Sequence, residues 1–262
     1  MLPSALKHVQ EIAGRSGRVA VFLDYDGTLT PIASRPEEAV LSNSMRAVLR
    51  ALATNVPVAI MSGRELEDVR LRVDIDAIVC GGSHGFDIAG SRGLRRQMAT
   101  EFLPDLDMAE KELREALDGL PGALVERKRF SLAAHYRNVS ENDVSKVERA
   151  VSEVAARHRE LRKIDGKKVY ELLPDIDWDK GKAVLWLLET LGLESRSGGV
   201  RPVYIGDDTT DEDAFRALEQ CGVGIIVSEK PQPTAARYSL KNPLEVERFL
   251  RVLTDHLRTK RL

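Results

Sequence analysis

The sequence has little cysteine, no long apolar run and almost no net charge. Only Cys80 and Cys221 occur among the 262 residues. Two cysteines so far apart exclude a disulfide scaffold and a cysteine-based zinc site, and they favour a reducing cytoplasm. The 39 basic residues are balanced by 41 acidic ones, which argues against a dedicated nucleic-acid binder. Every apolar run is far shorter than the roughly 20 residues that span a bilayer.

The N-terminal residues show no basic stretch followed by an apolar one, so no secretory signal is expected and the chain is assigned to the cytoplasm. Apolar residues make up 43% and charged residues 31%, as in ordinary globular proteins. This length allows one or two domains at roughly 150 residues each. No long exposed apolar helix is expected, which favours a monomer without membrane contact.

Short apolar runs, each followed by a polar turn, recur along the chain. They span residues 19–23, 56–61, 77–80, 202–205 and 224–227. Runs that are apolar on both faces are typical of buried parallel strands. Helical patterns lie between them, for example at 38–53, 64–72, 180–191 and 211–220. This alternation predicts an α/β domain with a doubly wound, Rossmann-like parallel sheet.

The middle of the chain has a different pattern. A charged helical stretch is followed by two strand-like stretches, a second helix and a hairpin around Gly166. The successive ranges are 105–119, 123–129, 130–137, 141–158, 161–165 and 167–173. This α-β-β-α-β-β order predicts a small α+β domain at 105–174, inserted into a core made of 1–104 and 175–262.

Carboxylates follow two of the predicted core strands. Asp24 and Asp26 follow the first, and Asp207, Asp208 and Asp211 follow the strand at 202–205. Ligands of open parallel sheets bind at the carboxyl ends of the strands, where these side chains should converge. Carboxylates crowded together repel one another unless a cation is present, and oxygen ligands without His or Cys favour Mg²⁺. The alternatives are a β-turn and an acid-rich helix N-terminus.

The string Asp24-Tyr25-Asp26-Gly27-Thr28-Leu29 resembles the first motif of the haloacid-dehalogenase-like (HAD) phosphatases. Ser62 matches their second motif, and Lys180 in Asp179-Lys180-Gly181 matches the third. Gly206-Asp207-Asp208 with Asp211 matches the fourth. The resemblance implies a HAD core, and the insertion fits members that carry an α+β cap between the second and third motifs.

A closer resemblance is to the trehalose-6-phosphate phosphatase family. It rests on Gly206 to Phe215, Gly82-Ser83-His84-Gly85, Glu126-x-Lys128, His135-Tyr136-Arg137 and Glu171-Leu172-Leu173-Pro174. The family usually carries a basic residue just before that proline, where this chain has Leu173. The departure puts one sugar or phosphate contact in doubt.

The resemblance implies a Mg²⁺-dependent phosphatase that forms an aspartyl phosphate on Asp24. Asp26 is then the general acid and base, and Ser62 and Lys180 bind the transferring phosphoryl group. Mg²⁺ is held by Asp24, the backbone carbonyl of Asp26 and Asp207, with Asp208 and Asp211 acting through water.

The substrate-binding residues expected from the resemblance lie after strands and in the cap. They are Arg64, His84, Glu126, Lys128, His135, Arg137 and Glu171. In the cap, alternation puts Glu126 with Lys128 on one face of a strand, and His135 with Arg137 on one face of the next. The alternatives are that Arg64 pairs with Glu67 or Asp68 on its helix, that His84 is a turn residue, and that the cap residues are solvated.

The predicted reaction is hydrolysis of trehalose 6-phosphate, in a chain that acts with a trehalose-phosphate synthase. A phosphatase for a sucrose- or glucosylglycerol-type phosphate is the alternative within the same chemistry. A non-catalytic sugar-phosphate-binding module is the alternative from another class. No G-x-G-x-x-G string follows the first strand, which argues against a nucleotide-binding dehydrogenase.

Overall fold

The computed structural model of the chain describes residues 2–14, 17–193 and 199–260. It forms two compact units, one made of Met1–Arg95 and Asp179–Leu262 and the other of Arg96–Trp178. The insertion predicted at 105–174 lies within the second unit, which extends further at both ends. At its start the 3₁₀ turn Thr100–Phe102 leads directly into a helix, and at its end Arg162 donates a hydrogen bond to the Trp178 carbonyl.

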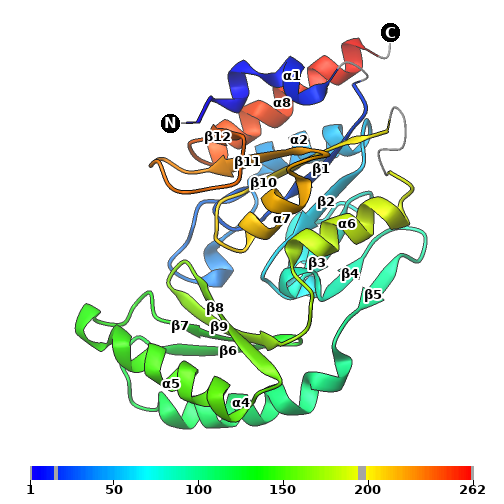
Figure 1. Ribbon diagram of the computed structural model, residues 1–262. Helices are drawn as coiled ribbons and strands as arrows, with labels where there is room; N and C mark the ends of the chain where they lie inside the picture. The colour runs from blue at the N-terminus through cyan, green and yellow to red at the C-terminus, as the bar shows by residue number, and fades with distance from the viewer. Residues whose placement is uncertain (1, 15–16, 194–198, 261–262) are drawn as a thin grey trace. The chain divides into compact units, whose positions relative to one another are not determined.

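A central sheet of eight strands organises the first unit (Figure 1). Its spatial order is β12-β11-β10-β1-β2-β3-β4-β5. The strands are β1 (Val19–Leu23), β2 (Val58–Met61), β3 (Val79–Gly82), β4 (Asp87–Ala89), β5 (Arg95–Gln97), β10 (Arg201–Gly206), β11 (Val223–Val227) and β12 (Tyr238–Leu240). From β12 to β3 neighbouring strands are parallel, and β4 runs antiparallel to β3. The predicted parallel α/β core is confirmed.

Helices cover both faces of this sheet. They are α1 (Val9–Ala13), α2 (Asn43–Ala53), α3 (Leu66–Val73), α6 (Lys180–Thr190), α7 (Asp211–Leu218) and α8 (Pro243–Thr259), with 3₁₀ turns at Ala5–Lys7, Pro36–Glu38 and Ser83–Gly85. Val21 and Leu23 of β1 pack in one cluster with α1, α2, α3 and α8. On the opposite face the ring of Tyr204 contacts Phe215 of α7 edge to face, 5.8 Å between centroids. Among the described residues, none of the helices combines the length and apolar character of a membrane span.

The strand order reverses at β1. The chain proceeds from β1 through β2 and β3 toward one edge, and later from β10 through β11 and β12 toward the other. Leu23, the last residue of β1, lies beside Ile205 of β10. The segments that follow β1 and β10 therefore leave the sheet side by side, at the kind of switch point where α/β sheets bind ligands.

The second unit is a four-stranded antiparallel sheet with two helices (Figure 1). Its elements are α4 (Leu103–Ala116), β6 (Leu124–Lys128), β7 (Ser131–His135), α5 (Val144–Arg157), β8 (Leu161–Gly166) and β9 (Val169–Pro174), with a 3₁₀ turn at Glu141–Asp143. Val125, Leu132 and Leu172 pack against α4 and α5 in one apolar cluster. The chain order matches the α-β-β-α-β-β prediction, and it leaves the other face of the sheet without a helix from this unit.

Three strands were not predicted, and several predicted strand ends shift, most of them by one or two residues. β4, β5 and β12 were not predicted, because three residues are too few to show a periodic pattern. The strand predicted at 130–137 ends at His135, since a turn closed by a hydrogen bond from Val139 N–H to the Tyr136 carbonyl follows it. Alternation along β7 therefore does not reach Arg137.

The two thiols should differ in reactivity. Cys80 lies in β3 with 3% of its surface exposed, and burial raises its pKa to about 12, whereas Cys221 is exposed. Because the thiolate is the reactive form, an aromatic disulfide reagent at pH 8 should modify one thiol per native chain and two per denatured chain. Cys221→Ser should leave the native chain nearly unreactive, and rapid labelling of this variant would contradict the packing of β3.

Candidate active site

Asp24 and Lys180 form the centre of the site at the carboxyl end of β1. Asp24 comes directly after the strand, and its N–H donates to the Ile205 carbonyl at 2.9 Å. Lys180 is the first residue of α6, which begins after the capping residue Asp179. The Nζ atom of Lys180 donates to Oδ1 of Asp24 and to Oδ1 of Asp211, each at 2.7 Å. All three side chains are buried, so a single ammonium group bridges two carboxylates away from solvent.

Asp211 accepts two hydrogen bonds on each carboxylate oxygen. Oδ1 accepts from Lys180 and from the hydroxyl of Tyr204, both at 2.7 Å. Oδ2 accepts from the backbone N–H groups of Asp207 and Asp208, at 2.8 and 2.9 Å. A Cβ atom at Gly206 would overlap the Asp211 carboxylate, so glycine is needed there. Asp211 therefore holds the β10–α7 turn and Lys180 in one arrangement.

The cluster carries excess negative charge. Oxygen atoms of Asp24, Asp207 and Asp211 lie within 4.8 Å of one another, with Lys180 as the cation bonded among them. Burial raises the pKa of Asp24; Lys180 opposes this, and the carboxylates of Asp211 and Asp207 add to it. Burial lowers the pKa of Lys180, but Asp211 and Asp24 outweigh it and leave that pKa well above its usual value. The residues present fit a divalent cation, which would neutralise the remaining charge.

The carboxylates of Asp208 and Asp26, also predicted at the metal site, lie outside the cluster of Asp24, Asp207 and Asp211. The Asp208 carboxylate is not part of the three-residue group among the described residues, and its Oδ1 accepts from the N–H of Thr209 at 2.7 Å. The Asp26 carboxylate is bound to Arg64, so only its backbone carbonyl fits the predicted metal role. Gly27, at φ 81°, allows the close approach of Asp207, since a Cβ there would overlap that carboxylate.

The Ser62 turn is tied to the turn that contains His84. The N–H groups of Ser83 and His84 donate to the carbonyls of Arg64 and Ser62, at 2.6 and 2.9 Å. Ser83 and His84 both have positive φ, 46° and 58°, which is unusual outside glycine. A Cβ at Gly63 would come within 2.9 Å of the His84 ring, so the two turns are in close contact. His84 is thus placed beside the predicted phosphate-binding turn.

Arg64 points to the carboxylate that follows β1. It makes two hydrogen bonds to Asp26 at 2.7 Å and one to Asp68 at 2.8 Å. The sequence had left open whether Arg64 pairs with Glu67 or Asp68, and the structure selects Asp68. The contact with Asp26 was not predicted, because the two residues lie 38 positions apart.

The polar residues predicted in the cap form two pairs on one face of its sheet. His135 and Glu126 are hydrogen-bonded at 2.7 Å, and Lys128 binds Glu171 at 2.5 Å. Strand alternation and register place these side chains opposite the face that packs on α4 and α5. Burial raises the pKa of Glu126, but His135 and Lys128 outweigh it and leave that pKa below its usual value. This face therefore offers hydrogen-bond donors and acceptors that are already arranged in pairs.

Arg137 does not extend this face, although alternation predicted it to share a face with His135, and Leu173 adds no charged group to it. Arg137 lies in the turn after β7, is exposed, and donates to the Lys167 carbonyl at 3.1 Å. Leu173 is buried, and its cross-strand partner is Arg162 of β8, which shares its face. Arg162 was not predicted, because only the register of the hairpin reveals that it lies beside Leu173. The basic group next to residue 173 thus comes from the neighbouring strand.

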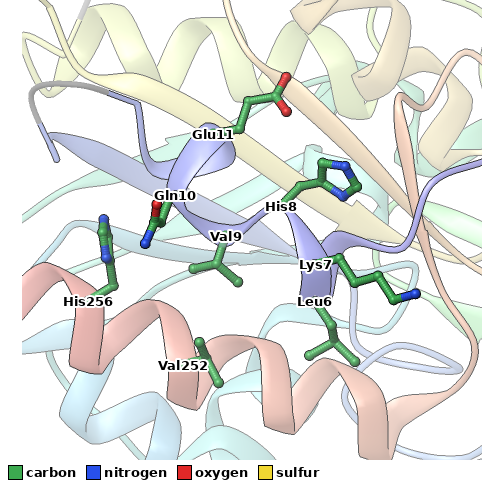
Figure 2. A pocket seen from close by; sticks show the side chains of 8 residues that line it. All are labelled: Leu6, Lys7, His8, Val9, Gln10, Glu11, Val252 and His256. Carbon is green, nitrogen blue, oxygen red and sulfur yellow. The ribbon is translucent and has the colours of Figure 1, made fainter.

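A pocket of about 490 Å³ lies elsewhere in the first unit (Figure 2). It is lined by Leu6, Lys7, His8, Val9, Gln10, Glu11, Val252 and His256. Figure 2 shows Val9 and Val252 near its middle, with Lys7 and His256 at opposite ends. Its polar groups do not converge, and Glu11 is paired with Arg237 at 3.0 Å. The carboxylate cluster therefore remains the candidate site, since its charged groups converge and those of this pocket do not.

The buried hydroxyl of Tyr204 is a second polar group of the candidate site that the sequence did not predict. It lies in an apolar run, where an aromatic residue is normally interpreted as packing. Its hydrogen bond to Asp211 depends on how α7 packs on β10, which no local pattern encodes.

Comparison with known proteins identifies related sequences and folds. Residues 22–244 match the trehalose-phosphatase family. The chain is 44% identical over 261 residues to probable trehalose-phosphate phosphatase 4 of Oryza sativa subsp. japonica, covering 97% of the chain and 71% of the relative. Trehalose-phosphate phosphatase B of Arabidopsis thaliana is 42% identical, with the same coverage. The C-terminal domain of Candida albicans trehalose-6-phosphate phosphatase has the same fold, with a TM-score of 0.84, 22% identity and coverage of 98% and 99%.

Proposed function

The chain belongs to the trehalose-phosphatase family, and we propose that it hydrolyses trehalose 6-phosphate to trehalose and phosphate through an aspartyl phosphate on Asp24. The observation that carries this proposal is the buried arrangement of Asp24, Lys180, Asp207 and Asp211 at the sheet switch point. It supplies a nucleophile, a fixed cation and a set of oxygen ligands within one site.

In the first step Asp24 attacks the phosphorus atom. Lys180 binds Oδ1 of Asp24, which leaves Oδ2 as the attacking oxygen. A bond forms between Asp24 and phosphorus, and the bond from phosphorus to the sugar oxygen breaks. Lys180 neutralises part of the negative charge that the carboxylate and the phosphate bring together, and the Ser62 hydroxyl donates to a phosphoryl oxygen.

Asp26 moves the proton in both steps. It gives a proton to the sugar oxygen as trehalose leaves, and it takes one back from the water that attacks the aspartyl phosphate. The second step releases phosphate and restores the Asp24 carboxylate. The side chain of Asp26 is 39% exposed, in contrast to the buried Asp24, so sugar and water can reach Asp26.

The residues that would hold Mg²⁺ are Asp24, Asp207 and the backbone carbonyl of Asp26, with Asp208 and Asp211 acting through water. Bound Mg²⁺ would supply positive charge for the phosphate oxygens and for the crowded carboxylates. The four hydrogen bonds that Asp211 already accepts support its indirect role.

The polar face of the four-stranded sheet binds the sugar in this proposal. Glu126, Lys128, His135 and Glu171 offer both hydrogen-bond donors and acceptors, which suits a neutral polyhydroxylated ligand. Arg162 supplies the basic group beside Leu173. Arg137 and His84 are the other substrate contacts of the proposal, whereas Arg64 is bound to Asp26 and Asp68.

The first experiment measures phosphate release from trehalose 6-phosphate, sucrose 6-phosphate, glucose 6-phosphate and an aryl phosphate, with Mg²⁺ and with a chelator. We expect Mg²⁺-dependent hydrolysis with a strong preference for trehalose 6-phosphate. Activity on the other esters alone would retain the carboxylate chemistry and discard the sugar assignment. No release from any ester would favour a binding module without catalysis.

Glu126→Ala should raise the KM for trehalose 6-phosphate about 10-fold or more, because a charged hydrogen bond is worth roughly 1.5–3 kcal/mol. The kcat/KM for the aryl phosphate should change little, since this ester has no sugar for Glu126 to bind. Exposed Glu153 on α5 provides the control, and Glu153→Ala should leave both substrates unaffected. An equal loss on both substrates would show that Glu126 does not recognise the sugar.

The proposal includes a cytoplasmic monomer that acts with a trehalose-phosphate synthase. The free thiols Cys80 and Cys221 support the cytoplasmic assignment. Light scattering of the purified chain tests the monomer.

A further inference from the structure

Arg64 holds the proposed acid–base residue with both arms of its guanidinium group. Its Nε donates to Oδ2 of Asp26 and its Nη2 to Oδ1, each at 2.7 Å. Two parallel hydrogen bonds of this kind fix both the position and the plane of a carboxylate. A lysine could supply the same charge but not this planar fork.

Arg64 is itself held from its other side. Its Nη1 donates to Asp68 and its Nη2 to the Pro36 carbonyl, both at 2.8 Å, and its guanidinium lies 5.4 Å from the Tyr25 ring centre. Arg72 then binds both oxygens of Asp68 at 2.8 Å. The guanidinium is therefore oriented by contacts within the protein.

The exposures of the two partners differ in a way that separates their roles. Only 10% of the Arg64 side chain is exposed, compared with 39% of the Asp26 side chain. Each Asp26 carboxylate oxygen accepts one hydrogen bond from Arg64 and can accept another from a group that approaches from solvent. A ligand can thus approach Asp26, while Arg64 stays buried against the protein.

We propose that Arg64 is the positioning residue for Asp26, which it holds in the place where Asp26 exchanges protons with the sugar oxygen and with water. This inference rests on the acid–base role proposed above for Asp26. It assigns Arg64 a function through Asp26 in place of direct sugar binding. Arg64 keeps its own protons throughout and only donates hydrogen bonds.

A double-mutant cycle with trehalose 6-phosphate tests this role. Asp26→Asn should lower kcat by about 10²–10⁴-fold, the usual contribution of a general acid or base. Arg64→Ala should lower kcat by about 10²-fold with little change in KM, and the double variant should be no slower than Asp26→Asn, because both changes remove the same proton transfer. Arg64→Lys should resemble Arg64→Ala, since the fork is lost.

Two outcomes would overturn the inference. If the losses in the double variant multiply, Arg64 acts independently of Asp26. If Arg64→Ala raises KM and leaves kcat unchanged, Arg64 binds substrate directly. A wild-type chain that releases no phosphate from any sugar phosphate would instead refute the proposed function itself.

Two further variants provide the controls. Arg70→Lys lies on the same helix, where exposed Arg70 pairs with Glu67 and contacts neither Asp68 nor Arg64, so its kcat should remain close to that of the wild type. Asp68→Asn loosens Arg64 while leaving it in place, and it should lower kcat modestly, with no further loss in the Asp26→Asn background. Comparing Asp68→Asn in the wild-type and Asp26→Asn backgrounds tests the positioning role even if Arg64→Ala does not fold. Thermal unfolding would show whether Arg64→Ala folds.

Discussion

Asp24→Asn is expected to abolish hydrolysis of trehalose 6-phosphate, with a loss on the order of 10⁴-fold or more, because the covalent route has no other nucleophile. The amide has nearly the shape of the carboxylate, and its oxygen can still accept the hydrogen bond from Lys180. Lys180 also retains its partner Asp211. The loss should therefore fall on kcat and not on folding.

The stability of this variant offers a second measurement. Burial raises the pKa of Asp24, so the folded state disfavours its charged form and the associated destabilisation grows as pH rises above the ordinary carboxyl pKa. Without metal, Asp24→Asn should be at least as stable as the wild type near pH 7. Added Mg²⁺ should raise the melting temperature of the wild type more than that of the variant, because the variant has lost a ligand.

Asp255→Asn provides the matched control, since Asp255 is exposed on α8. It should leave both activity and the Mg²⁺ response unchanged. An Asp24→Asn variant with more than a tenth of wild-type activity would refute the nucleophile assignment. A variant that unfolds without metal would show that Asp24 is needed for the fold.

Lys180→Met should damage both activity and stability. Removing this buried cation leaves Asp24 and Asp211 facing each other without their shared donor. Removing one partner of a buried ion pair typically costs about 3–5 kcal/mol in the free energy of unfolding. Phosphate release should fall at least about 10³-fold, because a preorganised charge that stabilises the transition state is lost.

The lost stability should return when negative charge is removed or balanced. Adding Asp24→Asn to Lys180→Met should recover part of the unfolding free energy, and Mg²⁺ should raise the melting temperature of Lys180→Met by more than that of the wild type. The control is Lys111→Met, at an exposed position on α4. If Lys180→Met melts at the wild-type temperature without metal, the described network does not stabilise the chain.

The carboxylates of the site could be predicted because their positions follow from local pattern. Asp24 directly follows an apolar strand, and Asp207 follows β10, so the parallel-sheet rule places them together. Their ligand chemistry depends on residue type alone. The site roles of these residues remain predictions, but their proximity is observed.

The partners of the site residues could not be predicted in the same way. Arg64 is four residues from Asp68, so the sequence indicated that contact as one alternative. Asp26 is 38 residues away, and nothing in the sequence indicated that Arg64 binds it. Tyr204 lies in an apolar strand and gave no polar signal at all. Arg162 becomes relevant only through its register with Leu173, which the hairpin sets.

By itself the sequence determined the fold class, the inserted α-β-β-α-β-β segment and the carboxylates that follow the strands, because periodicity and strand ends are local properties of the chain. The tertiary structure alone decided which donor each carboxylate receives. Asp211 accepts four hydrogen bonds, and Asp26 accepts hydrogen bonds from Arg64. These contacts arise where separate elements pack together. A hydrogen bond between residues far apart in the chain requires the donor–acceptor distance to be correct to within a few tenths of an ångström, and only the packed fold sets that distance.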